Sequence, residues 1–505
     1  MQNKLISFVF FPILGLSFAS CSQSPQVVPH DHVKKSNTFE SEKDHSLKSD
    51  EKKDINNETA DKDFQGHENT DPKLEQHEDG LNDPLKGTSS SSPTRNLKKN
   101  SNLLEEKYCT EDADLRSLHE KAPGQVSFDY LAENSLKGNL NFKNSMIAGL
   151  SGLFYDESSH DLYVLSDDYG DPSRYDYYVF AGQNVSRYYT FNLSIEENQK
   201  THDVNFNLSP KDVFFFQDKK GYHYKNGSID PEAIALLPNK NILIASEQDP
   251  FYYISYYIFG MNLGTLTPKI LEFTPNGQLV SDFTLPSRYI PKDWETTGIT
   301  PNKGFEGLTV VNPDDDRYFA VMTEVPLQQD TKNGADYNRF ALYKRENGDI
   351  VLQDEYSYKM SELPKDITEG AYKISTGISE ILSIGDNNYL ALERSYVRYK
   401  KELNKAPQSV NRVYQFYVDP KSTTNTCKLE TLPKDLTPLK KRLVLDLNKV
   451  PYKGKVLDFQ YNFEGMTVGP KVDGHKTLLI VSDNNFEKET PSQFLLFKMN
   501  QDVQN

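Results

Sequence analysis

The chain has 505 residues, a formal net charge of −16 and only three cysteines. This length suits two or three average domains or one large repetitive domain. The acidic balance argues against nucleic acid as a partner, because binding a phosphate backbone needs a basic surface. It also argues against passive attraction to anionic lipid, and an acidic protein that acts on an anionic substrate needs cations to mediate the contact.

The first segment, residues 1–21, reads as a targeting signal. Lys4 precedes an apolar stretch that is too short to span a bilayer as a mature helix. The stretch ends in Phe-Ala-Ser-Cys21, which resembles the lipobox of bacterial lipoproteins, although an aliphatic residue is more usual than Phe18. The resemblance implies a lipidated Cys21 and an exported, envelope-anchored protein, and Ser22 favours the outer membrane. The alternative is an ordinary secretory signal with a chance cysteine.

Residues 22–105 are rich in Ser, Lys, Asp, Glu and Asn and nearly devoid of aromatic residues. Such a segment cannot bury enough apolar surface to offset the entropy of ordering it, so we expect a disordered polar linker. Five of the ten histidines lie here. They could bind a transition metal weakly, but their irregular spacing favours solvated polar filler. They are His30, His32, His45, His67 and His77.

A repeated pattern fills the remaining domain, residues 106–505. Five segments share one motif, beginning at Gly149, Asp230, Gly304, Gly377 and Asn462. Each is followed by a turn, a second strand and usually two further strand-like runs, which is the layout of a β-propeller blade. We therefore predict an all-β propeller of five four-stranded blades, with a degenerate sixth blade or a pair of β-sandwiches as alternatives. Residues 125–131 are expected to supply the strand that closes the last blade.

Acidic residues recur at the start of the first strand and the end of the second strand of each repeat. Antiparallel pairing should bring these ends together, and radial blades should gather them at one mouth of the central channel. The expected pairs are Glu232 with Glu247, Glu306 with Glu324, Glu380 with Glu393, and Glu464 with Asp483. In the first repeat Ser151 takes the place of the glutamate, near Asp167 and Asp168.

Two explanations remain open for these acids. Each glutamate could accept hydrogen bonds from backbone amides of the neighbouring blade, or the group could hold a hard cation, Ca²⁺ or Mg²⁺. Convergence of like charges favours the cation for the second-strand acids. The candidate metal ligands are Asp167, Asp168, Glu232, Glu247, Glu306, Glu324, Glu380, Glu464 and Asp483.

Several of these motifs together resemble the phytase-like family, described as having esterase-like activity of phytase. They include Gly149-Leu-Ser-Gly-Leu with Leu-Ser-Asp167-Asp, Pro301-Asn-Lys-Gly-Phe-Glu-Gly-Leu, and Asn462-Phe-Glu-Gly with Val-Ser-Asp483-Asn-Asn-Phe. The resemblance runs in order from about Gly149 to Phe486. It implies a bacterial secreted β-propeller associated with phosphoester hydrolysis of a phosphorylated small molecule or ester.

The residue chemistry favours metal-assisted hydrolysis over a serine triad. No histidine outside the linker belongs to a repeated motif, and the sequence around Ser151 lacks the spacing of a nucleophile elbow. Carboxylates can hold cations that activate water, and a guanidinium suits phosphate recognition. The candidate catalytic residues are Glu393, Asp167 and Glu324, and the candidate substrate-binding residues are Arg394, Lys303 and Arg398. A salt bridge to a neighbouring blade is the alternative role for Arg394.

The runner-up function is a monomeric, non-catalytic propeller that binds a ligand or a protein and uses cations structurally. Tyrosines such as Tyr252, Tyr253, Tyr256 and Tyr257 would suit such a surface, or simply a strand that faces its neighbours. Cys109 and Cys427 are expected to form a disulfide in an exported protein, with two free thiols as the alternative.

Overall fold

The computed structural model describes most of the chain from Cys109 onward. The described residues are 109, 112–121, 123–138, 140–167, 185–198, 200–201, 203–224, 228–247, 267–291, 296–300, 302–312 and 315–502. The predicted signal with Cys21, the linker with its histidines, Asp168 and the Tyr252–Tyr257 cluster lie outside these residues. They stay predictions.

Five four-stranded antiparallel sheets form the five blades of a β-propeller, as the repeats predicted. Strand pairs follow chain order within each of the first four blades, from the innermost strand outward. Blade 1 contains β4 (Leu150–Asp156), β5 (Asp161–Ser166), β6 (Arg187–Glu197) and β7 (Val204–Phe215). Blade 2 contains β8 (Asp230–Leu236), β9 (Ile242–Glu247), β10 (Lys269–Phe273) and β11 (Leu279–Asp282). Blade 3 contains β12 (Phe305–Asn312), β13 (Asp315–Thr323), β14 (Asn338–Glu346) and β15 (Asp349–Tyr358). Blade 4 contains β16 (Ala371–Gly385), β17 (Asn388–Tyr399), β18 (Gln408–Tyr417) and β19 (Lys440–Asp446).

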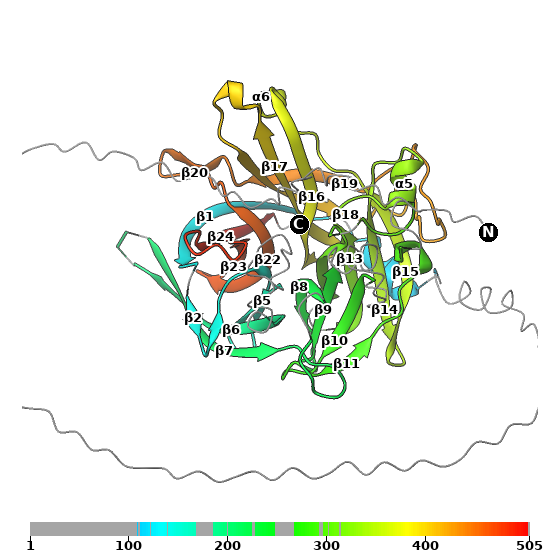
Figure 1. The fold of residues 1–505 in the computed structure, drawn as a ribbon, viewed down its shortest axis with the longest axis horizontal. Coiled ribbons are helices and arrows are strands. Elements are labelled where there is room, and N and C mark those ends of the chain that lie inside the picture. The colour runs from blue at the N-terminus through cyan, green and yellow to red at the C-terminus, as the bar shows by residue number, and fades with distance from the viewer. Residues whose placement is uncertain are drawn as a thin grey trace, which may run out of the picture. The chain divides into compact units, whose positions relative to one another are not determined.

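Strands from both ends of the domain complete blade 5. It consists of β22 (Asn462–Val472), β23 (His475–Asp483) and β24 (Ser492–Asp502), with β1 (Gln125–Leu136) as its outermost strand. The β1–β24 register runs from Gln125 opposite Asp502 to Leu136 opposite Ser492, and Figure 1 shows the two strands side by side in cyan and red. The predicted closing strand is confirmed, and it covers the edge that blade 5 would otherwise expose.

Hydrophobic cores lie between neighbouring blades, one at each of the five junctions. Alternation along a strand explains this arrangement, because successive side chains face opposite blades. On β13, Phe319 and Val321 pack toward blade 2, whereas Ala320 and Met322 pack toward blade 4. The innermost strands also contact one another in a closed circuit, β4 to β8, β12, β16, β22 and back to β4.

Short elements decorate this frame. Two small hairpins are present, β2 (Asn141–Phe142) with β3 (Ser145–Met146) and β20 (Val450–Tyr452) with β21 (Lys455–Leu457). The helices are α2 (Ala113–His119), α5 (Gln328–Lys332), α6 (Lys365–Thr368), η1 (Ser287–Tyr289) and η2 (Lys401–Leu403). Within the part of the chain that the structure describes, none of the helices has both the length and the apolar character needed to cross a bilayer.

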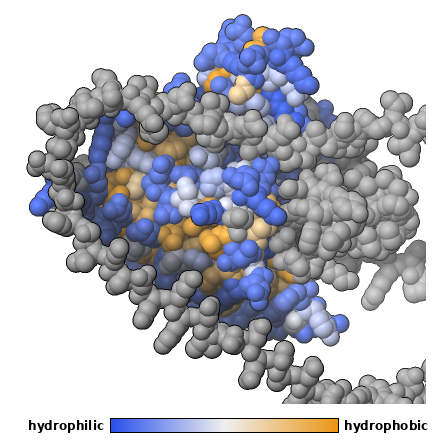
Figure 2. Space-filling model, turned by 60° about the vertical axis from the view of Figure 1, so that its left-hand side comes forward, coloured by the Kyte–Doolittle hydropathy of each residue, from blue (hydrophilic) through white to orange (hydrophobic). Residues whose placement is uncertain are grey.

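The long hairpin of β16 and β17 projects beyond the rest of blade 4 and carries α6 and η2 at its outer end. It stands at the top of Figure 1. In Figure 2 the same projection is coloured mostly as hydrophilic residues, with small hydrophobic areas among them. Exposed apolar side chains at its outer end include Tyr372, Ile374 and Leu403.

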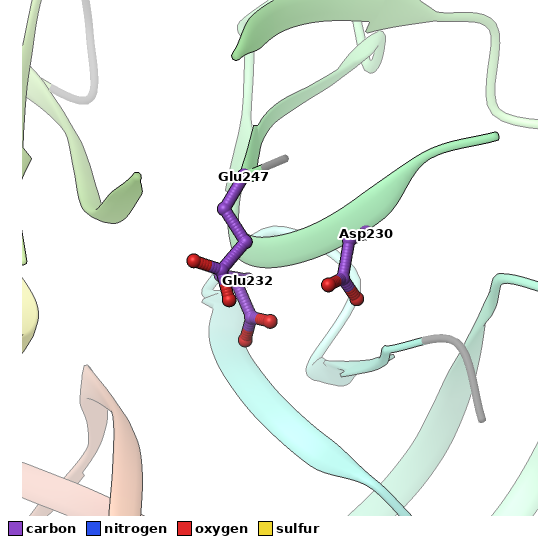
Figure 3. Close-up of side chains that lie close together, drawn as sticks. All are labelled: Asp230, Glu232 and Glu247. Carbon is purple, nitrogen blue, oxygen red and sulfur yellow. The ribbon is translucent and has the colours of Figure 1, made fainter. Parts of the chain in front are cut away.

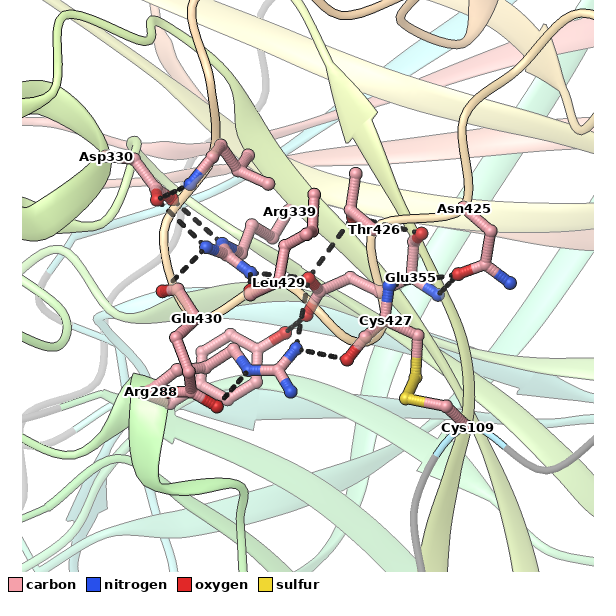
Figure 4. Close-up of polar contacts among 12 residues, drawn as sticks. Cys109, Arg288, Asp330, Arg339, Glu355, Asn425, Thr426, Cys427, Leu429 and Glu430 are labelled. Atoms are coloured by element: carbon pink, nitrogen blue, oxygen red, sulfur yellow. Dashed lines mark hydrogen bonds and ion pairs between the residues drawn. A yellow bond between two sulfur atoms is a disulfide. The ribbon is translucent and has the colours of Figure 1, made fainter. Parts of the chain in front are cut away.

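The predicted Cys109–Cys427 disulfide is present, so the segment before blade 1 is tied to the loop between β18 and β19. A buried ion network lies next to it (Figure 4). Both guanidinium groups of the network, Arg288 and Arg339, contact Glu355, and Arg339 also pairs with Asp330. The side chains of Arg339, Asp330 and Glu355 are fully buried.

Candidate functional site: a ring of carboxylates on the inner strands

The innermost strand of every blade contains a β-bulge, which lies near the start of the strand in four blades and in the middle of β16 in blade 4. In blade 3, Phe305 pairs with Thr323 and Gly307 with Met322, so Glu306 is the extra residue between two paired positions. The same shift occurs in the other four blades. The bulge residues are Ser151, Glu232, Glu306, Ser379 and Glu464. Because a bulge interrupts the alternation of side chains, it turns these residues out of the strand's regular pattern.

Close approach of the inner strands explains the small residue that usually follows the bulge. A Cβ at Gly465 would lie 3.0 Å from both the Cα of Gly152 and the carbonyl oxygen of Ser151 in blade 1. The strands β22 and β4 can therefore approach this closely only because both residues are glycines. The bulge glutamates lie near one another, since the charge of Glu306 acts on Glu232 and that of Glu464 acts on Glu306.

The end of the second strand supplies the other half of the site. This position lies opposite the residue that stands two places before the bulge residue of the innermost strand. In blade 5, for example, Asp483 pairs with Asn462, and the bulge residue is Glu464. Its occupants are Asp167, Glu247, Glu324, Arg394 and Asp483. We call these five residues and the five bulge residues the inner ring. Seven of its ten members are acids, two are serines, and one is a guanidinium.

Blade 4 departs from the sequence-based pairing, and the prediction that Glu380 lies beside Glu393 is wrong. Glu380 follows the bulge residue Ser379, so it occupies the position of Gly307 and Gly465 rather than that of the acids. Its Oε1 accepts hydrogen bonds from the backbone N–H groups of Leu308, at 3.1 Å, and Ile381, at 2.8 Å. The backbone-amide explanation therefore holds for Glu380, which serves to join blades 3 and 4.

Glu393 lies one residue before the ring position, where the other blades carry Ser or Thr. Alternation along β17 turns it to the face opposite Arg394. Its carboxylate accepts a hydrogen bond from the Tyr358 hydroxyl at 2.8 Å and pairs with Lys441. The structure thus places Glu393, expected as a catalytic residue, outside the inner ring.

Arg394 joins acids of two blades across the ring. It pairs with Glu464 of blade 5, and its Nη2 lies 3.5 Å from Glu306 Oε2 and 3.8 Å from Glu324 Oε1 in blade 3. Lys303, just before β12, approaches the same region, with its Nζ 2.7 Å from Glu324 Oε1. The salt bridges expected as the alternative role of Arg394 are therefore present.

Charge at the ring is strongly unbalanced. Asp230, at the start of β8, adds an eighth carboxyl group beside Glu232 and Glu247, while Lys303 and Arg394 supply positive charge. Burial raises the pKa of Glu232 and Glu306 well above the ordinary value, and the neighbouring carboxylates raise it further. Burial and the charge of Glu324 likewise raise the pKa of Glu247 to about 7. Burial and, after it, the mutual repulsion of the carboxylates thus disfavour the charged forms, and a bound cation would offset both effects.

Blade 5 shows the same effect. Burial and the adjacent Glu464 hold the pKa of Asp483 well above its usual range, and burial raises the pKa of Glu464 even though Arg394 opposes the shift. The predicted neighbourhood of Glu464 and Asp483 is confirmed. Burial disfavours the charged form of Lys303, but Glu324 and Glu306 outweigh it and raise the pKa of this amine.

Two sets of three carboxylates have the spacing of cation ligands. The first triad is Asp230, Glu232 and Glu247, and the second triad is Glu247, Glu306 and Glu324. In each triad, one oxygen from every residue lies within 4.8 Å of the others, and Figure 3 shows the side chains of the first triad together. Two oxygens bound to one Ca²⁺ at about 2.4 Å can lie at most about 5 Å apart, so both triads fit a hard cation.

A buried oxygen of the second triad strengthens this fit. Glu324 Oε2 is inaccessible to solvent and has no hydrogen-bond partner among the described residues. An ionised oxygen in that situation is costly unless a cation or a proton compensates it. Space for this side chain depends on Gly377, where a Cβ would lie 2.5 Å from Glu324 Oε1. Pairing of Glu306 with Glu324 and of Glu232 with Glu247 is thus confirmed.

The ring serines act in packing. Ser151 Oγ donates to the carbonyl oxygen of Pro231 at 3.2 Å, and Ser379 Oγ donates to that of Phe463 at 3.1 Å. Each joins its blade to the following blade at an equivalent place. The contact of each hydroxyl with the next blade is one that stabilises packing, and the expectation against a serine nucleophile stays a prediction.

The remaining expected site residues divide between the ring and its surroundings. Asp167 occupies the strand-end position of blade 1, and its charge acts on Glu232. Arg398 lies on the projecting part of β17, where its guanidinium stacks 5.3 Å from the ring centre of Tyr396. It shares a strand face with Arg394, four residues away, but lies beyond the inner ring.

Sequence reasoning missed Asp230 and Asn462, which both open an innermost strand. Asn462 Nδ2 donates to Glu464 Oε1 at 2.7 Å, and its Oδ1 accepts from Arg394. A signal existed, because both residues stand two positions before a bulge glutamate in their repeats.

Comparisons with known proteins agree with the motifs. No curated protein matches the chain. Solved structures that show a low similarity to this chain include the N-terminal domain of Nup159 (10% identity, 75% of this chain and 98% of that chain, TM-score 0.24). A putative gluconolactonase (11%, 76% and 95%, 0.28) and an α-L-arabinofuranosidase from Fusarium graminearum (10%, 73% and 97%, 0.33) are also similar. These low scores support no argument about function.

A family model gives the specific result. The model described as phytase-like, "Esterase-like activity of phytase", matches residues 145–486, which is more than half of the chain and spans all five blades. The match begins just before β4 and ends just after β23, so it contains every member of the inner ring. The chain therefore belongs to the phytase-like family.

Proposed function

We propose that this protein is a hydrolase of phosphoesters that works with divalent cations held by the inner ring. The observation that carries the proposal is the surplus of buried carboxylates at one end of the channel, next to two basic side chains that reach solvent. The side chains of Lys303 and Arg394 are 33% and 20% exposed, whereas that of Glu324 is 3% exposed. The basic groups thus lie where an anionic substrate would arrive.

Each part of the ring has a distinct role in this proposal. The first and second triads hold Ca²⁺ or Mg²⁺, because hard cations prefer carboxylate oxygens. When bound, such a cation neutralises phosphate charge and lowers the pKa of a coordinated water. Arg394 and Lys303 bind and orient the phosphate group, and Arg398 extends this basic face along the projecting hairpin. Glu324 and Asp167 remain the proposed catalytic carboxylates.

The direct test is phosphate release from phytate and from a simple phosphomonoester by the purified full chain, with Ca²⁺, with Mg²⁺ and with chelator. We expect turnover that needs a cation and falls at least about 100-fold in Glu306→Gln. Glu393→Gln is the matched control, because this carboxylate faces away from the ring, and it should keep most of the activity. Turnover that persists in chelator, or that Glu306→Gln leaves intact, would contradict the proposal.

A second candidate is a binding module without catalysis, for which the projecting hairpin gives the specific observation. Tyr372 and Ile374 are 59% and 42% exposed at its outer end, with Leu403 nearby at 51%. Exposed apolar groups on a projection suit contact with a protein or another ligand. Absence of turnover under every condition, combined with a higher melting temperature in Ca²⁺, would favour this second function.

We also propose, from the sequence motifs, that the protein is exported and held in the bacterial envelope through lipid on Cys21, and that it acts as a monomer. Labelling of cells with a radioactive fatty acid tests the anchor. Incorporation into the wild-type chain and its loss in Cys21→Ala is the expected result. Equal incorporation in both chains would refute it.

A further inference from the structure

The two carboxylate triads share one residue, Glu247, and they differ in what surrounds them. Glu247 lies at the end of β9, with Glu232 of its own blade on one side and Glu306 and Glu324 of blade 3 on the other. Its Oε2 also accepts a hydrogen bond from the backbone N–H of Gly304 at 2.9 Å. This bond fixes the orientation of the one carboxylate that belongs to both triads.

Both basic side chains of the site act on the second triad. Lys303 Nζ lies 2.7 Å from Glu324 Oε1, and Arg394 Nη2 lies 3.5 Å from Glu306 Oε2. They therefore compete with a cation for the same carboxylates. Yet Glu324 Oε2 stays buried without a hydrogen-bond partner among the described residues, so these contacts leave one ligand oxygen of the triad unused.

The same two side chains are the groups that a phosphate would bind. Guanidinium and ammonium groups form charge-assisted hydrogen bonds with phosphate oxygens, and both groups here reach solvent. A phosphate that draws Lys303 and Arg394 toward the channel mouth would leave Glu306 and Glu324 open to a cation. Binding of the anion and binding of the second cation should therefore help each other.

We propose that Glu247 bridges two divalent-cation positions, and that the second triad takes its cation in step with an anionic group that draws Lys303 and Arg394 away from it. The first triad binds its cation without substrate, whereas the second triad binds its cation only when an anionic group of the substrate is present. This inference deepens the proposed function and rests on it. Because the coupling is thermodynamic, phosphate must raise the affinity for the second cation by the same factor as that cation raises the affinity for phosphate.

Equilibrium dialysis of the full chain against Mg²⁺, with and without inorganic phosphate, tests the proposal. Mg²⁺ is the probe because it stays soluble with millimolar phosphate at neutral pH. We expect one tightly bound Mg²⁺ without phosphate, and a second whose affinity rises about tenfold in its presence. Phosphate that leaves Mg²⁺ affinity and stoichiometry unchanged would overturn the proposal.

Variants test separately whether Glu247 is a ligand of both cations (the bridge) and whether the second cation replaces the contacts of Lys303 and Arg394 (the exchange). Lys303→Met should bind the second Mg²⁺ without phosphate, because the competing amine is gone. Lys269→Met is the matched control, since Lys269 forms a similar ion pair, 2.6 Å from Asp282, at the outer strands of blade 2. Glu247→Gln should weaken both positions, whereas Glu306→Gln should weaken only the second. Identical dialysis curves for Lys303→Met and the wild type would contradict the exchange.

These outcomes are distinct from failure of the proposed function. A chain that binds a single Mg²⁺ regardless of phosphate, yet releases phosphate from esters, would overturn the bridge and leave the hydrolase proposal standing. A chain that binds neither Mg²⁺ nor Ca²⁺ would overturn both. Near-ultraviolet circular dichroism of each variant shows whether its fold is intact, so that loss of binding can be assigned to the altered ligand.

Discussion

The propeller contains two clusters of buried carboxylates, and they are built on opposite principles. In the network beside the disulfide, Asp330 and Glu355 face Arg288 and Arg339, so negative and positive groups are matched. Both oxygens of Asp330 bind Arg339, and one also accepts from the N–H of Leu432. At the inner ring, eight carboxyl groups including Asp230 face two basic side chains among the described residues, Lys303 and Arg394.

The comparison teaches that burial of acids does not itself identify a functional site. Buried charges that are fully paired and hydrogen-bonded fix a local structure. A surplus of one sign, kept close together in the folded protein, instead calls for a partner from solution. The network therefore reads as a structural joint between blade 3 and the β18–β19 loop, and the inner ring as the place of binding.

The largest expected effect comes from breaking the matched network. Arg339→Met leaves Asp330 and Glu355 buried with reduced compensation, which should cost about 3–5 kcal/mol of unfolding free energy. Urea unfolding of the wild type and the variant measures this loss. Binding of Mg²⁺ by the remaining folded protein should not change.

A control for this prediction is Arg317→Met. Arg317 also contacts two acids, Asp114 and Asp315, but its side chain is 50% exposed. Exposed pairs contribute at most about 1 kcal/mol, so the control should be nearly neutral. If both variants lost the same stability, burial would not be what distinguishes the network.

The next effect concerns how the stability of the protein depends on pH near the matched network. His119 in α2 is buried, its Nδ1 lies 3.9 Å from Asp354 Oδ2, and Asp354 precedes Glu355 on β15. Burial lowers the pKa of His119 from 6.5 to about 4. The unfolded chain therefore takes up this proton first, and stability should fall as pH drops from about 6.5 to 4.

The loss attributable to His119 should reach roughly 3 kcal/mol at pH 4. His119→Phe keeps a ring against Tyr356, whose ring centre is 5.9 Å away, but cannot titrate. As pH falls, the wild type should thus lose more unfolding free energy than the His119→Phe variant. A difference that does not vary with pH would mean that His119 is not held neutral.

A smaller effect of opposite sign is expected at the inner ring. Glu306→Gln removes one negative charge from a crowded group, so in chelator it should stabilise the protein by on the order of 1 kcal/mol. In millimolar Mg²⁺ together with phosphate the order should reverse, because the variant lacks a ligand of the second cation. Thermal unfolding in both conditions measures the change. Glu355→Gln in the matched network should destabilise in both.

Sequence periodicity predicted the propeller because each blade repeats one motif at one place. Five repeats and the closing strand before Gly149 followed from the pattern, whereas the disulfide was favoured over two free thiols on the expectation that the protein is exported. Most of the ring was also predictable, since Glu232, Glu306 and Glu464 stand at the same place in their repeats. The sequence pattern could not predict the β-bulge. This single inserted residue reverses which of the following side chains face each side of the strand.

Blade 4 shows how this limit produces an error. Its acids, Glu380 and Glu393, each lie one residue away from the ring position, and an off-by-one placement in a strand turns a side chain to the other face. The occupants of the ring positions are Ser379 and Arg394. Aligning the repeats by strand position rather than by acidic residues would have found both. The matched network was missed for a different reason, because its members are far apart in sequence and belong to no repeat.

The smallest effect concerns the two serines that stand at bulge positions, and it distinguishes packing from chemistry within the ring itself. Ser379→Ala and Ser151→Ala each remove one hydrogen bond to the next blade and leave a buried carbonyl oxygen with one donor fewer, so each should cost about 1 kcal/mol of unfolding free energy. Phosphate release and Mg²⁺ binding should stay within about twofold of the wild type, because neither hydroxyl is proposed to touch substrate or cation. Loss of turnover in Ser151→Ala alone, with the fold retained, would instead show that Ser151 takes part in the reaction. Catalysis would then depend on a hydroxyl of the ring as well as on its cation-binding carboxylates.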